Sequence, residues 1–597
     1  MLSTVPFVSP TVVFCFVGAY VVVGFVVKAA LRMWHGRQVW ASTRAPAAAD
    51  PHWLFGNVVQ IILKNGTRRH DYVTSLLQQR RTQTLLIRGL SVAAPTVGWA
   101  PPNRLVTIDP AVVRHILADK YNAYIKKMSY IYGFHKLLGN GIFSVDHGPH
   151  ASDGGASWRW QRKAAARIFT RNNFRSTMKD VFVANGRLLA DIIGSAAANG
   201  VAVDIQDLFF RYTMDSIGQI GFGVQMGTMA RAKVGGYASG GTPGATAAAE
   251  RISDRAHTFA KNFDEAHRRM MLFKNSLVMR LIIDLLPSPF SAAALALFMR
   301  FDANACAFSA AVRALDSFSL KLIRQRRAEG TETLAAKSDL LALFMREAGA
   351  TSNSSTDKVG AIPPGLDAGA STAPGKGHAT DRQLRDVVMS FIIAGRDTTA
   401  CLLSWTAVIL ATHPHIAAKV RTEVAAALPD LQEPTFETAG ERQLPYLNAV
   451  LKEALRLYPP VPQDGKVAAV DDTLPDGTHV PRGTIVAYFP WGMGRSEHIW
   501  GSDASDVRPE RWLGGGPIVG PDGVRRQPTS FEFPVFQAGP RICLGMNMAM
   551  LEASVATAML AQRFKFRLAD PERTHTYNSL GLTMSVNGGV RVFAEPI

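Results

Sequence analysis

The chain has 597 residues and a mass of 64.8 kDa, and its 47% hydrophobic and 19% charged residues exclude an intrinsically disordered chain and a fibre. Its 65 Lys and Arg against 47 Asp and Glu give a net charge of +18, which suits binding to nucleic acid or to an anionic membrane surface. The four cysteines lie far apart without a C-x-x-C pair, which excludes a disulfide scaffold and a cysteine-based zinc site.

An uncharged apolar segment opens the sequence. Residues 1–27 contain no Lys, Arg, Asp or Glu, and the apolar run from 5 to 27 exceeds the roughly 20 residues that span a bilayer. Four cations follow before the first acid: Lys28, Arg32, Arg37 and Arg44. We therefore predict a membrane anchor over 1–33 and a basic linker over 34–50, with the body of the protein in the cytosol. A cleaved signal peptide, a mitochondrial presequence and a buried helix fit this pattern less well.

The remainder, 51–597, has mostly helical periodicity. The longest helix is predicted over 381–413, opened by a T-x-x-Q capping box at 380–383. A second helix is predicted over 445–457 and a strand over 484–489. Three segments rich in small or polar residues are interpreted as loop insertions: 147–157, 227–249 and 349–376. We predict one large, mainly helical domain.

Residues 536–545, F-Q-A-G-P-R-I-C-L-G, surround one cysteine with features that lower a thiol pKa. The Gly-Pro pair predicts a tight turn, Arg541 places a cation near Cys543, and the following helix directs its positive end toward the sulfur. We predict that Cys543 is a thiolate that acts as a nucleophile or as a metal ligand.

The long predicted helix contains a segment that is unfavourable in a helix interior, A-G-R-D-T-T at 394–399. Such local violations tend to mark functional sites. We predict a bulged turn that exposes Asp397 and Thr398 for proton transfer, with a merely kinked helix as the alternative.

Two further motifs are weak on their own. Glu453 and Arg456 are three residues apart and share a helix face. The segment R-P-E-R-W at 508–512 contains Arg511. We predict that these three charged side chains form one cluster.

In this order, the motifs resemble those of the cytochrome P450 haem-thiolate monooxygenases over roughly 50–597. Three more stretches agree with the family pattern: W-R-W-Q-R-K at 158–163, Y-P-P-V-P at 458–462 and W-G-M-G-R at 491–495. The resemblance implies a mainly α, single-domain fold with small β-sheets and an N-terminal transmembrane helix. It also implies haem b, iron protoporphyrin IX, as the cofactor.

The resemblance further implies roles for individual residues. Those expected to bind the cofactor are Trp158, Arg162, Ala394, Gly395, Phe536, Arg541, Cys543 and Gly545. Cys543 would be the axial ligand of the haem iron, and Asp397 and Thr398 would relay protons as catalytic residues. The members of the charged cluster would be structural: Glu453, Arg456 and Arg511.

The implied reaction inserts one oxygen atom of O2 into a C–H bond of a lipophilic substrate. Electrons would pass from NADPH through NADPH–cytochrome P450 reductase, with cytochrome b5 as a further donor. Segments 394–399, 471–478 and 493–501 resemble fatty-acid and alkane ω-hydroxylases, which favours a fatty acid over a sterol or other isoprenoid. A haem-thiolate isomerase or a peroxide-driven enzyme is the alternative chemistry.

The charge of +18 then has a more specific interpretation. Cations after the anchor suit the anionic lipids of an endoplasmic reticulum membrane, with a mitochondrial membrane as the alternative location. A second group suits an acidic reductase: Arg159, Arg162, Lys163, Arg167 and Arg171. Cations are scattered and no nucleic-acid motif is present, so we predict no nucleic-acid partner.

Overall fold

The structure is a computed structural model of the whole chain. It describes residues 57–88, 103–126, 132–231, 258–270, 290–350 and 379–597, except for residues 58, 521, 522, 574, 575 and 580. It also describes isolated residues within 19–48 and 233–238. Most of the predicted anchor and linker lies outside the described residues. So does most of the predicted insertions 227–249 and 349–376.

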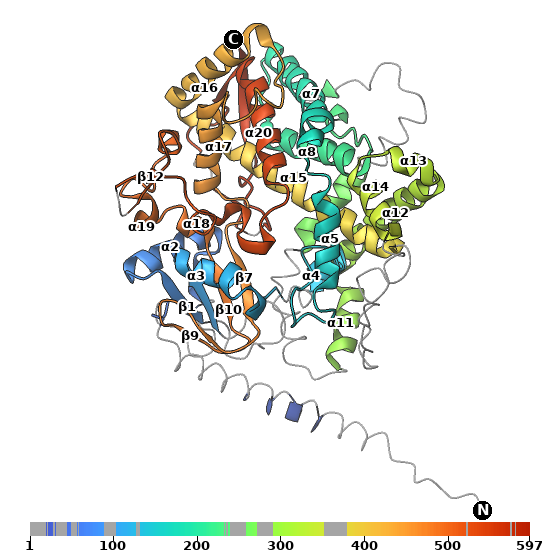
Figure 1. Cartoon of the computed structure of the whole chain (residues 1–597), viewed down its shortest axis with the longest axis vertical. Helices are drawn as coiled ribbons and strands as arrows, with labels where there is room; N and C mark the ends of the chain where they lie inside the picture. The colour runs from blue at the N-terminus through green and yellow to red at the C-terminus, as the bar shows by residue number, and fades with distance from the viewer. Residues whose placement is uncertain are drawn as a thin grey trace, which may run out of the picture.

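The described part of the chain is mainly helical, as predicted (Figure 1). Its α-helices are α2 (Arg69–Gln79), α3 (Pro110–Arg114), α4 (Tyr132–Leu138), α5 (Ala156–Ala166), α6 (Arg171–Asn173), α7 (Lys179–Ala198), α8 (Ile205–Phe222), α11 (Phe290–Phe301), α12 (Ala303–Ala328), α13 (Thr331–Ala336), α14 (Leu340–Ala350), α15 (Asp381–Thr412), α16 (Pro414–Ala427), α17 (Pro445–Leu457), α18 (Pro490–Met493), α19 (Glu497–Trp500) and α20 (Met546–Ala561). The bounds of α17 match the predicted helix over 445–457.

Helix α15 crosses the middle of the molecule (Figure 1) and packs against α8, α12, α17 and α20. Its start is the predicted capping box. The backbone N–H of Gln383 donates to Thr380 Oγ1 over 3.2 Å, and the backbone N–H of Thr380 donates to the Gln383 side-chain oxygen Oε1 over 2.8 Å. The helix ends where Pro414 begins α16. Its apolar residues are buried around most of its circumference, which explains how so long a helix can lie in the core.

The prediction of a bulged turn within α15 is wrong. The helix is uninterrupted from Asp381 to Thr412, and the Thr398 hydroxyl donates to the Ala394 carbonyl over 2.7 Å. The glycine in this segment has a packing role, because a Cβ on Gly395 would lie 2.7 Å from Cδ1 of Ile217 in α8. A small residue therefore lets the two helices approach closely.

A five-stranded sheet lies at the lower left of Figure 1, beside α2 and α3. Its order is β1 (Thr84–Arg88), β2 (Asn103–Thr107), β10 (Ile485–Tyr488), β7 (Asp464–Ala468) and β3 (Tyr124–Ile125), antiparallel except for β2 with β10. A second sheet joins β13 (Phe564–Leu568), β14 (Arg591–Pro596) and β4 (Val203–Asp204). Strand β10 confirms the strand predicted over 484–489.

Two described helices are long and apolar enough to cross a membrane by length and composition, Arg171–Ala198 and α15. In α15, 78% of the most apolar stretch is buried inside the protein, so its composition follows from its place in the core.

A buried ionic cluster joins α17 to the chain between Gly494 and Trp512. The fully buried carboxylate of Glu453 accepts five hydrogen bonds: from Arg456 Nε (2.8 Å) and Nη2 (2.7 Å), Arg511 Nε (3.1 Å), the Trp512 indole (2.9 Å) and Arg508 N (2.8 Å). Arg456 also donates to the backbone carbonyls of Gly494, Ala504 and Asp506. Several donors around one carboxylate offset the cost of burying these charges.

Glu453→Gln should destabilise the protein by about 3–5 kcal/mol, because the buried Arg456 guanidinium would lose its carboxylate partner and Arg511 would keep only Asp503. The control is Glu441→Gln. The Glu441 carboxylate is 57% exposed and lies 2.6 Å from Lys452, so its loss should cost less than about 1 kcal/mol. Urea unfolding followed by circular dichroism gives both values. Equal losses in the two variants would contradict a structural role for Glu453.

Candidate active site

The structure encloses a cavity of about 610 Å³, within the range of small-molecule sites. Its wall comes from α2, α4, α5, α8, α15, β1, β2, β7, β10 and the segment that leads into α20. Nine predicted site residues line it: Trp158, Arg162, Ala394, Gly395, Thr398, Phe536, Arg541, Cys543 and Gly545. Asp397 does not line the cavity, and Glu453, Arg456 and Arg511 form the buried cluster described above.

Cys543 lies between a 3-10 turn (Gly539–Arg541) and the start of α20. Its backbone N–H donates to the Phe536 carbonyl over 2.8 Å, which closes the loop around the thiol. Gly539 has φ +65°, and a Cβ there would collide with the Leu117 carbonyl, so the turn requires glycine. The thiol is accessible and lines the cavity.

The expected lowering of the thiol pKa is not found. The thiol faces the cavity below the outer surface, and desolvation there raises the pKa of Cys543 above its usual value, against the opposite effects of the Gly545 N–H group and the Arg162 guanidinium. The protein alone therefore does not make a strongly activated nucleophile. A metal ion deprotonates a coordinating thiol, so the arrangement favours a metal ligand over a nucleophile.

Two arginines and an indole lie together beside the thiol loop. The Arg541 guanidinium is 4.9 Å from the Trp158 ring centre, and Arg162 is 5.9 Å from the same ring. Arg541 is fixed by donating to the carbonyls of Val145 (2.7 Å) and Ile142 (3.4 Å). This group presents positive charge at one end of the cavity.

The insertion predicted over 147–157 is not wholly a surface loop. His147 is 1% exposed, and its ring stacks on Tyr121 with 3.7 Å between ring centres. Burial and the Arg541 charge lower the pKa of His147 to about 3, so the neutral ring accepts a hydrogen bond from Arg541 Nε over 3.0 Å. Later in the segment, Asp153 accepts from the backbone N–H of Gly155 (2.8 Å) and Ser157 (2.9 Å) at the start of α5. The segment thus orients both Arg541 and the helix that carries Arg162.

A buried lysine was missed by sequence reasoning. Lys466 of β7 is 1% exposed and lines the cavity, and its Nζ lies 3.6 Å from Asp464 Oδ2 without a hydrogen-bond partner among the described residues. Burial lowers the pKa of Lys466 to about 7, although Asp464 opposes this effect. The sequence signal for Lys466 is a lysine within a short strand, at a position that alternation places on the buried face. The sequence does not show that this face lines the cavity; the fold does.

The residue that follows Phe536 has a rare backbone conformation. Gln537 has φ +61° and ψ −176°, a region used almost only by glycine, which costs on the order of 1–3 kcal/mol. Its amide donates to Asp464 Oδ2 over 2.6 Å. The same carboxylate therefore anchors the thiol loop and faces Lys466.

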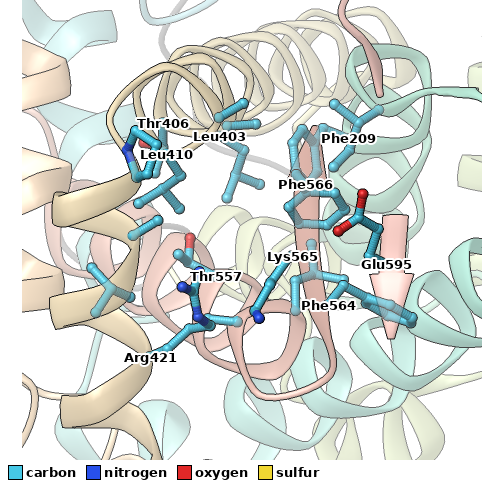
Figure 2. A pocket seen from close by; sticks show the side chains of 18 residues that line it. Phe209, Leu403, Thr406, Leu410, Arg421, Thr557, Phe564, Lys565, Phe566 and Glu595 are labelled. Atoms are coloured by element: carbon cyan, nitrogen blue, oxygen red, sulfur yellow. The ribbon is translucent and has the colours of Figure 1, made fainter. Parts of the chain in front are cut away.

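A separate, smaller pocket of about 230 Å³ lies among α8, α15, α16, α20 and β13, shown in Figure 2. Its wall is mostly apolar, with Arg421 and Lys565 among the few charged side chains. It contains none of the predicted site residues, so the larger cavity is the candidate active site.

Comparison with known proteins agrees with this geometry. The family model for cytochrome P450 matches residues 46–589. The chain belongs to the cytochrome P450 family. It is similar to cytochrome P450 704C1 of Pinus taeda (32% identity, 88% of each chain covered). It is also similar to two proteins of Arabidopsis thaliana: cytochrome P450 704B1 (31% identity, covering 88% of this chain and 91% of the relative) and cytochrome P450 94C1 (29% identity, covering 88% and 89%).

This P450 is therefore an oxidoreductase that incorporates oxygen, of a family that uses haem and O2. The residues present fit a haem. The cavity places a thiol beside cations and apolar walls, which suits a metal-containing, anionic and largely apolar group. Among the described residues, no group of three or more His, Cys, Asp or Glu side chains gathers to bind a metal ion.

Gly395→Ala should destabilise the P450 by about 1–3 kcal/mol, because the added Cβ would press on the buried Ile217 side chain. Without that contact, Gly to Ala in a helix would stabilise by about 1 kcal/mol. The control is Gly194→Ala in α7, where a Cβ would lie 3.6 Å from Phe564, an ordinary contact. In a double-mutant cycle measured by chemical unfolding, Ile217→Ala should relieve the cost of Gly395→Ala. Strictly additive losses would show that the steric explanation is wrong.

Proposed function

We propose that this P450 is a membrane-bound hydroxylase of long-chain fatty acids that acts at or near the chain end remote from the carboxylate. The observation that carries the proposal is the accessible Cys543 thiol in a large, mainly apolar cavity with positive charge beside it. The bound haem b would supply the activation of O2 and the insertion of one oxygen atom into a C–H bond.

The residues would divide the work of binding the cofactor. Cys543 would ligate the iron, and Phe536 would shield the sulfur. Arg541, Arg162 and Trp158 would hold the propionates, and we add Lys466 because a propionate would accept the hydrogen bond that Asp464, 3.6 Å away, does not. Thr398 would take part in proton transfer from the cavity wall, with Asp397 behind it.

The substrate class is supported by the chemistry of the cavity wall. Apolar side chains from α4, α8, α15 and β10 would pack against an alkyl chain. Arg69 of α2 also lines the cavity, and burial lowers its pKa, so a carboxylate is the partner that would stabilise its charge. The similarity of segment 394–399 to ω-hydroxylases supports the same class.

Electrons would come from NADPH through NADPH–cytochrome P450 reductase, with cytochrome b5 as a further donor. Helix α5 supports a reductase docking site on its outer face, because Trp158 and Arg162 line the cavity while Arg159 and Lys163 are exposed. Exposed cations on this helix would speed the encounter with an acidic partner and make it sensitive to salt.

The proposed location is the endoplasmic reticulum membrane, with a mitochondrial membrane as the alternative. Helix α11 supports contact with lipid, because Leu297 and Phe301 are 61% and 73% exposed. The Tyr20 ring, within the predicted anchor, lies 5.9 Å from the Phe290 ring at the start of this helix. The anchor and α11 would then meet the bilayer together.

Cys543→Ser should abolish the thiolate-type absorption band of the reduced carbon monoxide complex, because the axial sulfur would be lost. The matched control is Cys306→Ser, whose thiol is exposed on α12. That variant should keep the band at the wild-type intensity. Retention of the band in Cys543→Ser would contradict the ligand assignment.

Fatty acids should give a stronger substrate-type spectral shift than alkanes or sterols of comparable size. Arg69→Gln should weaken fatty-acid binding about tenfold and leave alkane binding unchanged, because it removes only the partner of the carboxylate. The control is the neighbouring Arg68→Gln, since the Arg68 side chain is 71% exposed and pairs with Asp71. Spectral titration gives the dissociation constants. Preferential sterol binding would instead support the isoprenoid alternative.

The alternative chemistry, a peroxide-driven enzyme or isomerase, is favoured by one observation: Asp397 does not line the cavity. Product analysis with NADPH and reductase, compared with hydrogen peroxide alone, distinguishes the cases. Hydroxylated product that forms equally well with peroxide alone would support the alternative.

A further inference from the structure

The smaller pocket in Figure 2 is separate from the candidate active site. It has a volume of about 230 Å³, and no described residue lines both it and the larger cavity. Protein interiors are close-packed and contain few voids larger than a water molecule, so a pocket of this size can hold a ligand. Because sites for drug-sized molecules have roughly 300–1,000 Å³, its occupant must be small.

The inner wall of this pocket is apolar. The Phe209, Leu403 and Phe564 residues that line it are 2%, 1% and 7% exposed. Two small residues, Ala407 and Ala417, also line it, where larger side chains would fill the space. Apolar walls offer water few hydrogen-bond partners, whereas contact with a hydrocarbon removes apolar surface from water. The wall therefore suits a short alkyl chain.

The mouth of the pocket carries positive charge. Arg421 of α16 and Lys565 of β13 line it, and Figure 2 shows both side chains reaching it from the same side. Neither forms an ion pair with another described residue. Glu595 lies opposite Lys565 in the β13–β14 pair, but its carboxylate pairs with Arg567 over 3.4 Å. The two cations are therefore available to an anionic head group.

A buried hydroxyl adds a directed polar contact. Thr557 of α20 is 6% exposed and lines the pocket, and its side chain forms no hydrogen bond with the described residues. Thr406 of α15 lines the same pocket, but its hydroxyl donates to the Leu402 carbonyl over 2.8 Å. Buried polar groups are normally hydrogen-bonded. A carboxylate oxygen would give the Thr557 hydroxyl the acceptor that it lacks.

We propose that this pocket is a second ligand site, which binds a small carboxylate with a short alkyl chain. The carboxylate lies at Arg421, Lys565 and Thr557, and the chain lies against the apolar wall. The inference goes beyond the proposed function and does not depend on the substrate of the larger cavity.

The occupant is a carboxylate dissolved in the aqueous phase rather than a membrane lipid. Helices α16 and α20 lie in the upper part of Figure 1, whereas α11, proposed above to contact lipid, lies in the lower part. The volume of about 230 Å³ also suits one short chain rather than a lipid with two long chains.

The pocket and the larger cavity are lined by consecutive parts of the same helices. In α15, Leu402 lines the cavity and Leu403 lines the pocket, and in α20 Glu552 lines the cavity and Thr557 lines the pocket. A carboxylate that also entered the larger cavity would confuse a simple titration. The larger cavity must therefore be blocked during the test.

The test is a calorimetric titration of octanoate into the haem-loaded full chain, with the larger cavity blocked by phenylimidazole, whose ring nitrogen binds iron. Wild type should bind one octanoate per chain. Octanol should bind about tenfold more weakly, because it lacks the charge. No saturable binding of octanoate would overturn the site, and tighter binding of octanol would overturn the anionic assignment.

A filling substitution tests the location. Ala417→Leu should weaken octanoate binding about tenfold, because the added side chain occupies the pocket. The matched control is Ala418→Leu, at the next position of α16, which is exposed and does not line the pocket. It should bind as wild type does. Equal affinity in Ala417→Leu and wild type would show that octanoate binds elsewhere.

Two further pairs test the head-group contacts and do not rely on filling the pocket. Lys565→Gln should weaken octanoate binding about threefold and leave octanol binding unchanged, whereas the exposed Arg442→Gln should change neither. Thr557→Val should also weaken octanoate binding about threefold, whereas Thr406→Val should not, because the Thr406 hydroxyl is already bonded within α15.

The thermal unfolding midpoint and the reduced carbon monoxide spectrum check that each variant is folded and haem-loaded. Wild-type octanoate affinity in both Lys565→Gln and Thr557→Val would overturn the proposed head-group site. A failure of fatty acids to bind in the larger cavity would refute the proposed substrate and leave the titration with blocked cavity unchanged, so the two failures are distinguishable.

Discussion

A fully buried carboxylate, Glu453, organises the side of the molecule that carries the thiol. It holds α17 to the chain between Gly494 and Trp512 through a network of charged hydrogen bonds. Strand β7 follows α17 and brings Asp464 to the cavity. Asp464 in turn fixes Gln537, whose unusual backbone conformation aims the loop that presents Cys543. The buried ion cluster and the loop that presents Cys543 are thus connected through strand β7 and the Asp464 carboxylate.

The cavity combines a thiol whose pKa is raised by desolvation with several cations, of which Arg541 is held in place by neutral partners. His147 stays uncharged beside Arg541 because burial and the arginine lower the pKa of the ring. Such a site disfavours a free thiolate but suits an anionic group that brings its own metal charge. The Asp397 carboxylate of α15 does not line the cavity and pairs instead with Arg396 and His267, so neighbouring residues of one motif lie in different surroundings.

Sequence reasoning succeeded where chemistry and local structure coincide along the chain. The capping box of α15, the bounds of α17 and the motif around Cys543 each depend on residues a few positions apart, and the family assignment follows from them. It failed where tertiary packing decides the path of a helix or the surroundings of a side chain. The segment 394–399 predicts a bulged turn, yet Gly395 lies in an uninterrupted helix and lets Ile217 approach it closely. Adjacent residues of a helix point about 100° apart, so Asp397 and Thr398 face different surroundings despite their shared motif. The role of His147 depends on Arg541, 394 residues further along the chain, and that of Lys466 depends on which face of its strand lines the cavity.

The account depends most directly on whether the sulfur of Cys543 binds iron. Resonance Raman spectroscopy of the haem-loaded chain, with and without ³⁴S-labelled cysteine, measures this bond. The account predicts an iron–sulfur stretching band that moves to lower frequency on labelling, and that persists when Cys15, Cys306 and Cys401 are all replaced by serine. The absence of any sulfur-sensitive band, or its loss in that triple variant, would contradict the assignment of Cys543 as the ligand.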